Sequence, residues 1–275
     1  MNYSLYNYIV LNSTDIKNLY KKYNVNASKK FGQNFLIDQN ILNNIIDVSE
    51  INGKDVIEIG PGLGSLTHYL IKDAKTVTSY EIDEDMIKVL KEEIKSENFN
   101  LIEGDFLNAN FDYDGKRTIV ANIPYNITSD ILFKLFENSK KIDRAVIMMQ
   151  KEVAERLNAP VGSKSYGKLT ISAQHFSEIK YEFTVPENSF VPAPKVKSAV
   201  VTFNFKNIDF ENSNDFLKFV KQCFSMRRKT LFNNLKNFLG HEIARKLVDY
   251  LNMGDAVRPQ ELSYTDFINL FNNTL

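Results

Sequence analysis

Hydrophobic positions along this chain fall into short runs that are separated by stretches with helical spacing. Five apolar runs have the length of a buried strand: 56–59, 76–80, 100–103, 118–121 and 145–149. Between some of them, as in 129–137, apolar residues recur three and four positions apart, which predicts intervening helices. Alternating strands and helices predict a Rossmann-like α/β fold on a mostly parallel sheet. Two later runs predict an antiparallel pair that completes seven strands: 181–185 and 198–205.

The hydrophobic period becomes helical near Ile208 and stays helical afterwards. Four segments there have helical spacing: 215–224, 228–238, 242–251 and 264–271. We therefore predict a helical domain over 208–275 and a larger α/β domain over 29–207. Residues 1–28 form an N-terminal extension, in which 15–23 has the pattern of a short helix.

Composition removes several classes of protein. The chain has 34 basic and 34 acidic residues and no net charge, so a polyanionic partner must be held by local patches. The single cysteine, Cys223, excludes an intrachain disulfide, and three scattered histidines give no expected metal site. No apolar run approaches the roughly 18 residues of a membrane span, and the N-terminus lacks the pattern of a signal peptide. We expect a cytoplasmic protein that contacts no membrane and binds no metal.

Three predicted strand ends carry residues suited to a nucleoside. The first strand runs into the glycine loop Gly60–Gly64, where the backbone can approach a ligand closely. Glu81 ends the next strand, 21 residues after Gly60, near the spacing at which a carboxylate binds ribose hydroxyls. Asp105 follows the third strand and can accept a hydrogen bond from an adenine amine, with Ile82 and Phe106 as apolar covers. These residues alone do not distinguish a dinucleotide from S-adenosylmethionine.

A fourth strand end carries an amide, a proline and an aromatic ring: Asn122, Pro124 and Tyr125. In an open α/β sheet, ligands bind outside the carboxyl ends of the strands. The Asn122 side-chain oxygen can accept from an exocyclic amino group, Pro124 fixes the backbone, and Tyr125 can stack on a flat ring. The segment predicts a site for the amino group of a base, although taken alone it is also an ordinary turn. Thr128 or Ser129 is expected to cap the following helix.

Nine segments resemble, in order along the chain, the small-subunit ribosomal RNA adenine dimethyltransferase family: KKFGQNFLID, EIGPGLGSLT, EIDEDM, EGDFL, NIPYNITSDILFKL, QKEVAERL, SYGKLTI, FVPAPKVKSAVV and FSMRRKTLFNNL. The resemblance spans roughly residues 29 to 260. It implies a Rossmann-like, S-adenosylmethionine-dependent methyltransferase with a seven-stranded, mostly parallel sheet and a small C-terminal helical domain. Members dimethylate the N6 atoms of two adjacent adenines in a hairpin loop near the 3′ end of 16S rRNA.

The resemblance also implies roles for individual residues. Those implied to touch the cofactor are Asn34, Leu36, Gly60, Gly62, Glu81, Ile82, Asp105, Phe106 and Asn122. Within this set, Glu81 would bind the ribose and Asp105 the adenine ring. Asn122 would accept from the target amine, while Tyr125 and Phe190 would cover the two faces of a flipped base.

Basic residues at two places are implied to contact RNA phosphates: Lys195, Lys197, Arg227, Arg228 and Lys229. The last three stand at a predicted helix start, and a short basic run of this kind is also typical of a solvated helix end. The segment 160–168, with two glycines, is expected to form a mobile loop over the pocket.

The expected partner is 16S rRNA within an immature 30S subunit, bound by a monomer. Because the chain is neutral overall, a partly assembled subunit is favoured over naked RNA. Two alternatives stay open: a 23S rRNA adenine N6-methyltransferase of the macrolide-resistance type, and a ribosome-assembly factor that acts chiefly by binding. The segment 190–196 and the SYGKLTI motif favour the small-subunit enzyme, and the intact set of cofactor residues favours catalysis.

Overall fold

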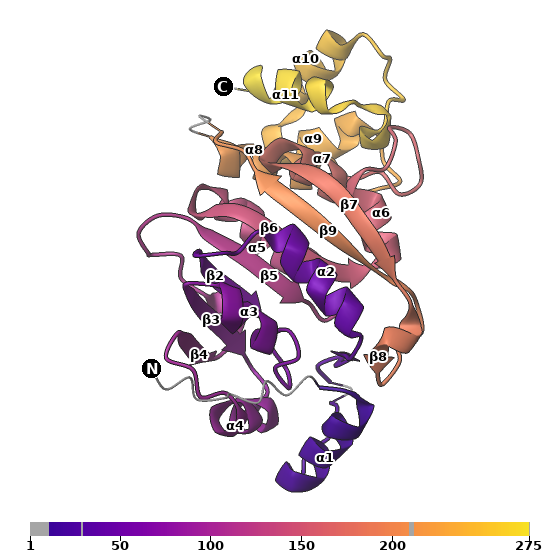
Figure 1. Ribbon diagram of the computed structural model, residues 1–275. Helices are drawn as coiled ribbons and strands as arrows, with labels where there is room; N and C mark the ends of the chain where they lie inside the picture. Colours follow the sequence, from indigo (N-terminus) through magenta and orange to yellow (C-terminus); the bar gives the residue numbers. More distant parts are fainter. Residues whose placement is uncertain (1–10, 29, 209–211, 275) are drawn as a thin grey trace.

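The computed structural model describes residues 11–28, 30–208 and 212–274. Its centre is a seven-stranded sheet of order β4-β3-β2-β5-β6-β9-β7 (Figure 1). Neighbouring strands from β4 to β6 are parallel, and β9 is antiparallel to both β6 and β7. The predicted seven-stranded, mostly parallel sheet is therefore confirmed. Its strands are β2 Asp55–Ile59, β3 Thr76–Glu81, β4 Phe99–Glu103, β5 Arg117–Asn122, β6 Ile142–Gln150, β7 Ser177–Val185 and β9 Ser198–Phe205.

Helices cover both faces of this sheet because successive strand side chains point to opposite sides. Ile57 and Ile59 belong to the core shared with two helices on one face, whereas Val56 belongs to the core shared with two helices on the other. The helices of the first face are α5 Thr128–Glu137 and α7 Lys168–Phe176. Those of the second are α2 Gln39–Ser49, capped by the Asp38 side chain, and α3 Thr67–Asp73, and both lie in front of the sheet in Figure 1.

The N-terminal extension packs on the α/β domain. Helix α1 Ser13–Tyr23 matches the expected short helix, and residues 1–10 lie outside the described part of the chain. Its buried residues share a core with α4 Glu84–Glu93, and the Lys22 and Tyr23 side chains both donate to the Glu93 carboxylate, at 2.7 and 2.6 Å. The extension therefore packs against α4, the helix that follows β3.

The C-terminal helices build a core of their own at one end of the sheet (Figure 1). They are α8 Ser213–Cys223, α9 Leu231–Leu239, α10 His241–Leu251 and α11 Tyr264–Asn272, close to the four predicted segments. Tyr166 and Ile171, which precede or belong to α7, pack into the same cluster. Because α9 begins only at Leu231, with Thr230 as its cap, the basic residues 227–229 lie in the preceding turn and not at a helix start.

The segment 160–168 does not lie over the ligand cavity described below, contrary to expectation. Gly162 N–H donates to the Gln260 carbonyl at 2.7 Å, and the Tyr166 hydroxyl donates to the Leu262 carbonyl at 2.6 Å. Because Tyr166 is buried, its hydroxyl needs an acceptor, and the C-terminal helical unit provides it. The segment thus joins the two parts of the chain. Between it and β6 lies α6 Lys151–Leu157.

Two further local expectations need correction. Helix α5 has Ile127 at its cap position with no side-chain hydrogen bond, and Ser129 lies inside the helix. Thr128 also lies inside the first turn, where its hydroxyl donates to backbone carbonyls of the preceding loop at 3.3 Å. A small second sheet was not predicted: β1 Phe35–Leu36 pairs antiparallel with β8 Phe190–Val191.

Candidate active site

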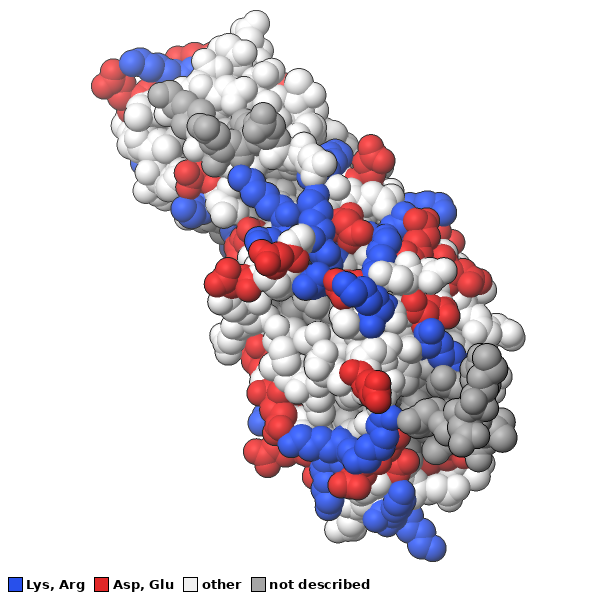
Figure 2. All heavy atoms as spheres, turned by 60° about the vertical axis from the view of Figure 1, so that its left-hand side comes forward, with Lys and Arg blue, Asp and Glu red and all other residues white. Residues whose placement is uncertain are grey.

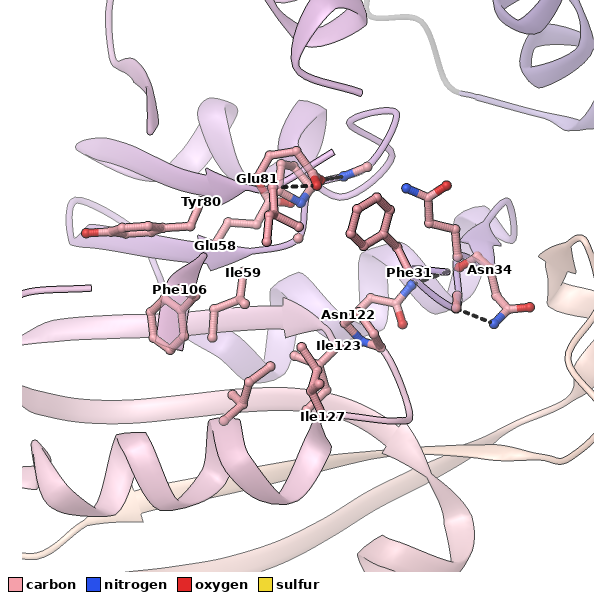
Figure 3. A pocket seen from close by; sticks show the side chains of 18 of the residues that line it. Phe31, Asn34, Glu58, Ile59, Tyr80, Glu81, Phe106, Asn122, Ile123 and Ile127 are labelled. Carbon is pink, nitrogen blue, oxygen red and sulfur yellow. Dashed lines mark hydrogen bonds between the residues drawn. The ribbon is translucent and has the colours of Figure 1, made fainter. Parts of the chain in front are cut away.

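A cavity opens at the carboxyl ends of β2, β3 and β5, where the strand order reverses. Strands β3 and β4 lie on one side of β2, and β5 and β6 lie on the other, so connections leave in opposite directions and create a crevice. Every residue that the sequence assigned to the cofactor lines this cavity: Asn34, Leu36, Gly60, Gly62, Glu81, Ile82, Asp105, Phe106 and Asn122. Figure 3 shows Tyr80 and Phe106 at one end of the cavity and Asn34 and Asn122 at the other.

The Glu81 carboxylate is held at the centre of the cavity wall by backbone N–H groups. Its Oε2 accepts from Gly62 at 3.0 Å, and its Oε1 accepts from Ile82 and Asp83 at 2.9 Å each. Burial raises the pKa of Glu81, while these donors pull the pKa back down. The donors fix the direction of the carboxylate and leave lone pairs that can accept from ribose hydroxyls.

The glycine loop requires glycine at Gly62 in particular. Its φ is +58°, a region that side chains disfavour, and an added Cβ would lie 2.8 Å from a ring carbon of Phe35. Gly60 has a similar φ of +65°, but a Cβ there would meet no atom within 4 Å. The loop therefore brings the backbone against Glu81 while keeping space above Gly60 for a ligand.

Glu58 is a second carboxyl in the cavity wall and is fully buried. It accepts hydrogen bonds from the Thr67 hydroxyl at 2.8 Å and the Ser79 hydroxyl at 2.6 Å. Burial and, to a smaller extent, the nearby Glu81 charge raise the pKa of Glu58 to about 7, although the two hydrogen bonds lower it. A buried carboxyl that is poised near neutrality favours a cationic ligand group, because a nearby cation stabilises its charged form.

Ser65 was not singled out from the sequence, yet it is placed to bind a ligand. It is 8% exposed, lines the cavity, and its hydroxyl finds no hydrogen-bond partner among the described residues. Buried hydroxyls are normally paired, so an unpaired one facing a cavity points to a polar ligand group. Only its place after the last glycine of the loop hinted at this role.

The other end of the cavity is an apolar slot. The Tyr80 and Phe106 rings lie edge to face with centroids 5.4 Å apart, and Ile82 stands 49% exposed at its rim. Asp105 lines the same end, where its side chain accepts from Leu107 N–H at 2.9 Å. A flat apolar slot with one carboxylate beside it matches an adenine ring and its amino group.

Asn122 ends β5, and its side chain is held in one orientation. The amide nitrogen donates to the Asn34 backbone carbonyl at 3.1 Å, as the dashed line in Figure 3 shows. Because a carbonyl can only accept, the amide must present its nitrogen to Asn34. No described residue donates to the Asn122 side-chain oxygen, which leaves that oxygen as an acceptor at the cavity.

Tyr125 and Pro124 follow on the same loop and line the cavity. The Tyr125 hydroxyl forms a 2.5 Å hydrogen bond with the hydroxyl of Ser198, the first residue of β9. This bond anchors the far edge of the ring on a buried strand. The ring is therefore fixed by two separate parts of the chain, as a stacking platform requires.

Phe190 is buried behind Leu36, one of the residues that line the cavity. It is 3% exposed, pairs with Leu36 across the small β1–β8 sheet, and packs in the core with Val185 and Val200. It is not among the residues that line the cavity. That Phe190 covers the second face of a base stays a prediction. Phe31, by contrast, lines the cavity beside Asn122 in Figure 3 and was not named from the sequence.

The basic residues form two exposed groups outside the cavity. Lys195 and Lys197 are exposed, and Lys197 directly precedes Ser198, which holds Tyr125. The exposed turn 227–229 lies near α9, and its Arg227 guanidinium donates to the Lys164 carbonyl. Figure 2 shows one face of the molecule, on which Lys and Arg side chains are mixed with acidic ones and blue atoms gather near the middle.

Within residues 11–28, 30–208 and 212–274, no group of three or more His, Cys, Asp or Glu side chains is placed to hold a metal ion. No helix in that part of the chain is both long and apolar enough to cross a bilayer.

These features together define a class of protein. A nucleoside slot with a ribose-binding carboxylate and an adjoining amide acceptor, on a seven-stranded sheet with one antiparallel strand, is the arrangement of a Rossmann-like methyltransferase that uses S-adenosylmethionine. The family model for ribosomal RNA adenine dimethylase matches residues 24–274. The chain belongs to the ribosomal RNA adenine dimethylase family.

Relatives and solved structures agree with this assignment. The ribosomal RNA small subunit methyltransferases A of Mycoplasma mobile and Mycoplasmopsis pulmonis are each 48% identical to this chain; the matches cover 90% and 89% of it and 97% and 98% of those proteins. A dimethyladenosine transferase from Plasmodium falciparum superposes with a TM-score of 0.73 at 30% identity, covering 88% of this chain and 98% of that one. The 23S rRNA methyltransferase ErmE gives 0.63 at 25% identity, covering 87% and 99%.

Proposed function

We propose that this protein transfers methyl groups from S-adenosylmethionine to N6 of two adjacent adenines in a hairpin loop near the 3′ end of 16S rRNA, during 30S subunit biogenesis. The observation that carries the proposal is the fixed Asn122 amide, whose oxygen faces a cavity that also holds a nucleoside slot. Family membership and the small-subunit relatives favour this target over 23S rRNA, since ErmE is the more distant of the two structural matches described above.

The residues of the cavity fit S-adenosylmethionine. Glu81 would accept from the ribose hydroxyls, and Asp105 with Phe106 and Ile82 would hold the adenine ring. The unpaired Ser65 hydroxyl would bond a polar group of the amino-acid end, which lies above the glycine loop. When bound, the cofactor supplies an electrophilic methyl group on a sulfonium sulfur.

Asn122 and Tyr125 would act on the target base. The Asn122 oxygen accepts a hydrogen bond from the exocyclic amine, which localises the nitrogen lone pair and makes the nitrogen more nucleophilic. Tyr125 stacks on the ring and holds the nitrogen in line, so that rate comes mainly from positioning. The nitrogen that gains a methyl group releases its proton to water, because a cationic amine of this kind is a strong acid. No general base is needed, and the cavity offers the amine none besides carboxylates already bound to other groups.

The exposed basic groups would bind RNA phosphates. Lys195 and Lys197 adjoin the strand that anchors Tyr125, and the turn 227–229 is held by the buried Asn234 side chain, which accepts from Met226 N–H at 2.7 Å. Replacing residues 227–229 by alanine should weaken RNA binding and reduce the salt dependence by about 2 to 3 in the slope of log K against log salt. An unchanged slope would place the RNA elsewhere.

The protein's neutral net charge suits a partly assembled subunit better than free RNA, because a structured particle can present several sites at once. We therefore propose the immature 30S subunit as the partner, bound by a monomer in the cytoplasm without a metal.

Asn122→Ala tests the proposed catalytic role. We expect methyl transfer to fall about 100-fold or more, the size seen when one preorganised hydrogen-bonding group is removed from a transition state. Binding of the subunit should change little, and the rate is measured at saturating S-adenosylmethionine because Asn122 also lines the cofactor cavity and bonds the Asn34 carbonyl. The matched control is Asn40→Ala, which removes an exposed amide on α2 outside the cavity and should leave the rate unchanged. Full activity of Asn122→Ala would refute the catalytic role. If the variant no longer methylates but still supports subunit maturation as the wild type does, assembly is the primary function.

A further inference from the structure

The N-terminal extension is the part of the chain to which the proposed function assigns no role. Its helix α1 Ser13–Tyr23 ends just before residue 24, where the match to the family model begins. The helix nevertheless packs on the cofactor half of the α/β domain, because its buried Ile16 and Leu19 share a core with Leu63 of the glycine loop. The extension is therefore part of the same packed unit as a loop that lines the cavity.

One chain of contacts leads from α1 through the glycine loop to the Glu81 carboxylate. The Tyr20 ring lies edge to face against the Phe35 ring, with centroids 6.3 Å apart. The Phe35 ring in turn fills the space beside Gly62, where an added Cβ would lie 2.8 Å from one of its carbons. The Gly62 N–H donates to Oε2 of Glu81 at 3.0 Å. Because glycine has no side chain to hold it in place, packing against the Phe35 ring restricts where this donor can move.

A second chain of contacts reaches the other oxygen of the same carboxylate. Ser28, the last residue of the extension, donates its N–H to the Gln33 side chain at 2.7 Å. The Gln33 amide donates to the Asp83 carboxylate, also at 2.7 Å. The Asp83 N–H donates to Oε1 of Glu81 at 2.9 Å. Both oxygens of Glu81 thus accept from backbone donors that contacts from the extension help to hold.

We propose that the N-terminal extension is a positioning element for cofactor binding, which keeps Glu81 aimed at the ribose hydroxyls; this inference rests on the ribose role proposed for Glu81 above. A carboxylate binds a ribose best when its direction is fixed in advance, because ordering it on binding costs affinity. The extension can fix it because α1 is itself fastened to α4, where Lys22 and Tyr23 donate to Glu93.

The extension acts through other residues and not by direct contact with the cofactor. None of its described residues, 11–28, lines the cavity, whereas Phe35 and Gln33 both do. Its effect on a ligand must therefore pass through these two side chains to Glu81. A ligand that lacks the ribose hydroxyls should not sense the extension, and this selectivity separates positioning from a general contribution to stability.

Tyr20→Ala tests the proposal by calorimetric titration with S-adenosylhomocysteine and with its counterpart that lacks the 2′- and 3′-hydroxyls. We expect the Kd for S-adenosylhomocysteine to rise about 2- to 12-fold, the range for loss of one aromatic pair. The Kd for the counterpart should change less than twofold, because it offers Glu81 no hydroxyl. Tyr20→Phe keeps the ring against Phe35 and should bind both ligands as the wild type does.

Control variants separate this role from loss of stability. Phe232→Ala removes a half-buried ring from the C-terminal helical unit, outside the cavity, and should lower the Tm without changing either Kd. Asn18→Ala changes an exposed residue of α1 and should change neither Kd. If Tyr20→Ala yields too little folded protein, Glu93→Gln weakens the anchor of α1 more mildly and should raise the Kd with the same selectivity.

Three outcomes would overturn the inference. Equal rises of both Kd values in Tyr20→Ala would show that the extension does not act through Glu81, and an unchanged Kd for S-adenosylhomocysteine would show that it has no part in cofactor binding. Equal binding of the two ligands by the wild type would show that Glu81 does not bind the ribose. Failure of the proposed RNA function is distinguishable, because these titrations are made without RNA.

Discussion

Glu58→Gln should make the protein more stable at alkaline pH relative to the wild type. Burial raises the pKa of Glu58 from its ordinary value of 4.5 to about 7 in the folded state. Between these values the unfolded chain loses a proton that the folded chain keeps, so the wild type loses stability as pH rises. The difference between the two pKa values corresponds to a loss of about 3 kcal/mol in the unfolding free energy of the wild type. This loss is complete above pH 7 and absent below about pH 4.5. Glutamine keeps an acceptor for the Thr67 and Ser79 hydroxyls and has no charge to desolvate.

The assay is urea unfolding of both proteins from pH 4.5 to 8.5 without cofactor, with the difference in unfolding free energy plotted against pH. The difference should rise by about 3 kcal/mol in favour of Glu58→Gln between pH 4.5 and pH 8. Taking the difference between the two proteins cancels the titration of groups that do not interact with Glu58. Glu92→Gln, which removes an exposed carboxylate from the surface of α4, is the matched control and should give a flat difference. A flat difference for Glu58→Gln as well would show that Glu58 ionises as in water, and would remove the argument for a poised carboxyl.

Two further substitutions test other parts of the cavity. Gly60→Ala should cost about 1 kcal/mol of backbone strain, whereas Gly62→Ala also displaces the Phe35 ring, so Gly62→Ala should have the lower Tm by calorimetry without cofactor; equal Tm values would contradict the clash. Tyr125→Phe loses only the hydroxyl bond to Ser198 and should lower kcat/KM for RNA a few-fold, whereas Tyr125→Ala should lower it about 5- to 150-fold. If phenylalanine is as poor as alanine, the hydroxyl and not the ring is the functional group.

Much of the fold follows from local pattern. The strands were predictable because parallel strands that are buried on both faces need continuous apolar runs. The runs 56–59 and 118–121 contribute residues to the cores on both faces of the sheet. Helix α7 was missed for a related reason. Seven of its nine residues are buried, so it has no polar face and no amphipathic period to recognise.

The cofactor end of the cavity was predictable because its residues come at the ends of predicted strands, which a parallel sheet must bring together. On the opposite wall, Asn34 and Leu36 were named from the resemblance, whereas Phe31 was not. The segment that carries Phe31 is joined to β5 by a hydrogen bond between Asn34 and Asn122, 88 residues apart, and no local pattern encodes such a contact. Phe190 illustrates the opposite difficulty. The sequence alone does not tell whether an aromatic ring between prolines faces a ligand or packs, as in this structure, against the core.

The measurement that tests the central claim most directly is methyl transfer from labelled S-adenosylmethionine to immature small subunits, large subunits and naked ribosomal RNA, with the modified base mapped. We predict dimethyladenine at two adjacent adenines near the 3′ end of 16S rRNA, formed most readily on the immature small subunit. Label found only in 23S rRNA would contradict the account and assign the chain to the macrolide-resistance type. Absence of label on every substrate, with small-subunit binding intact, would show that the protein acts by binding alone.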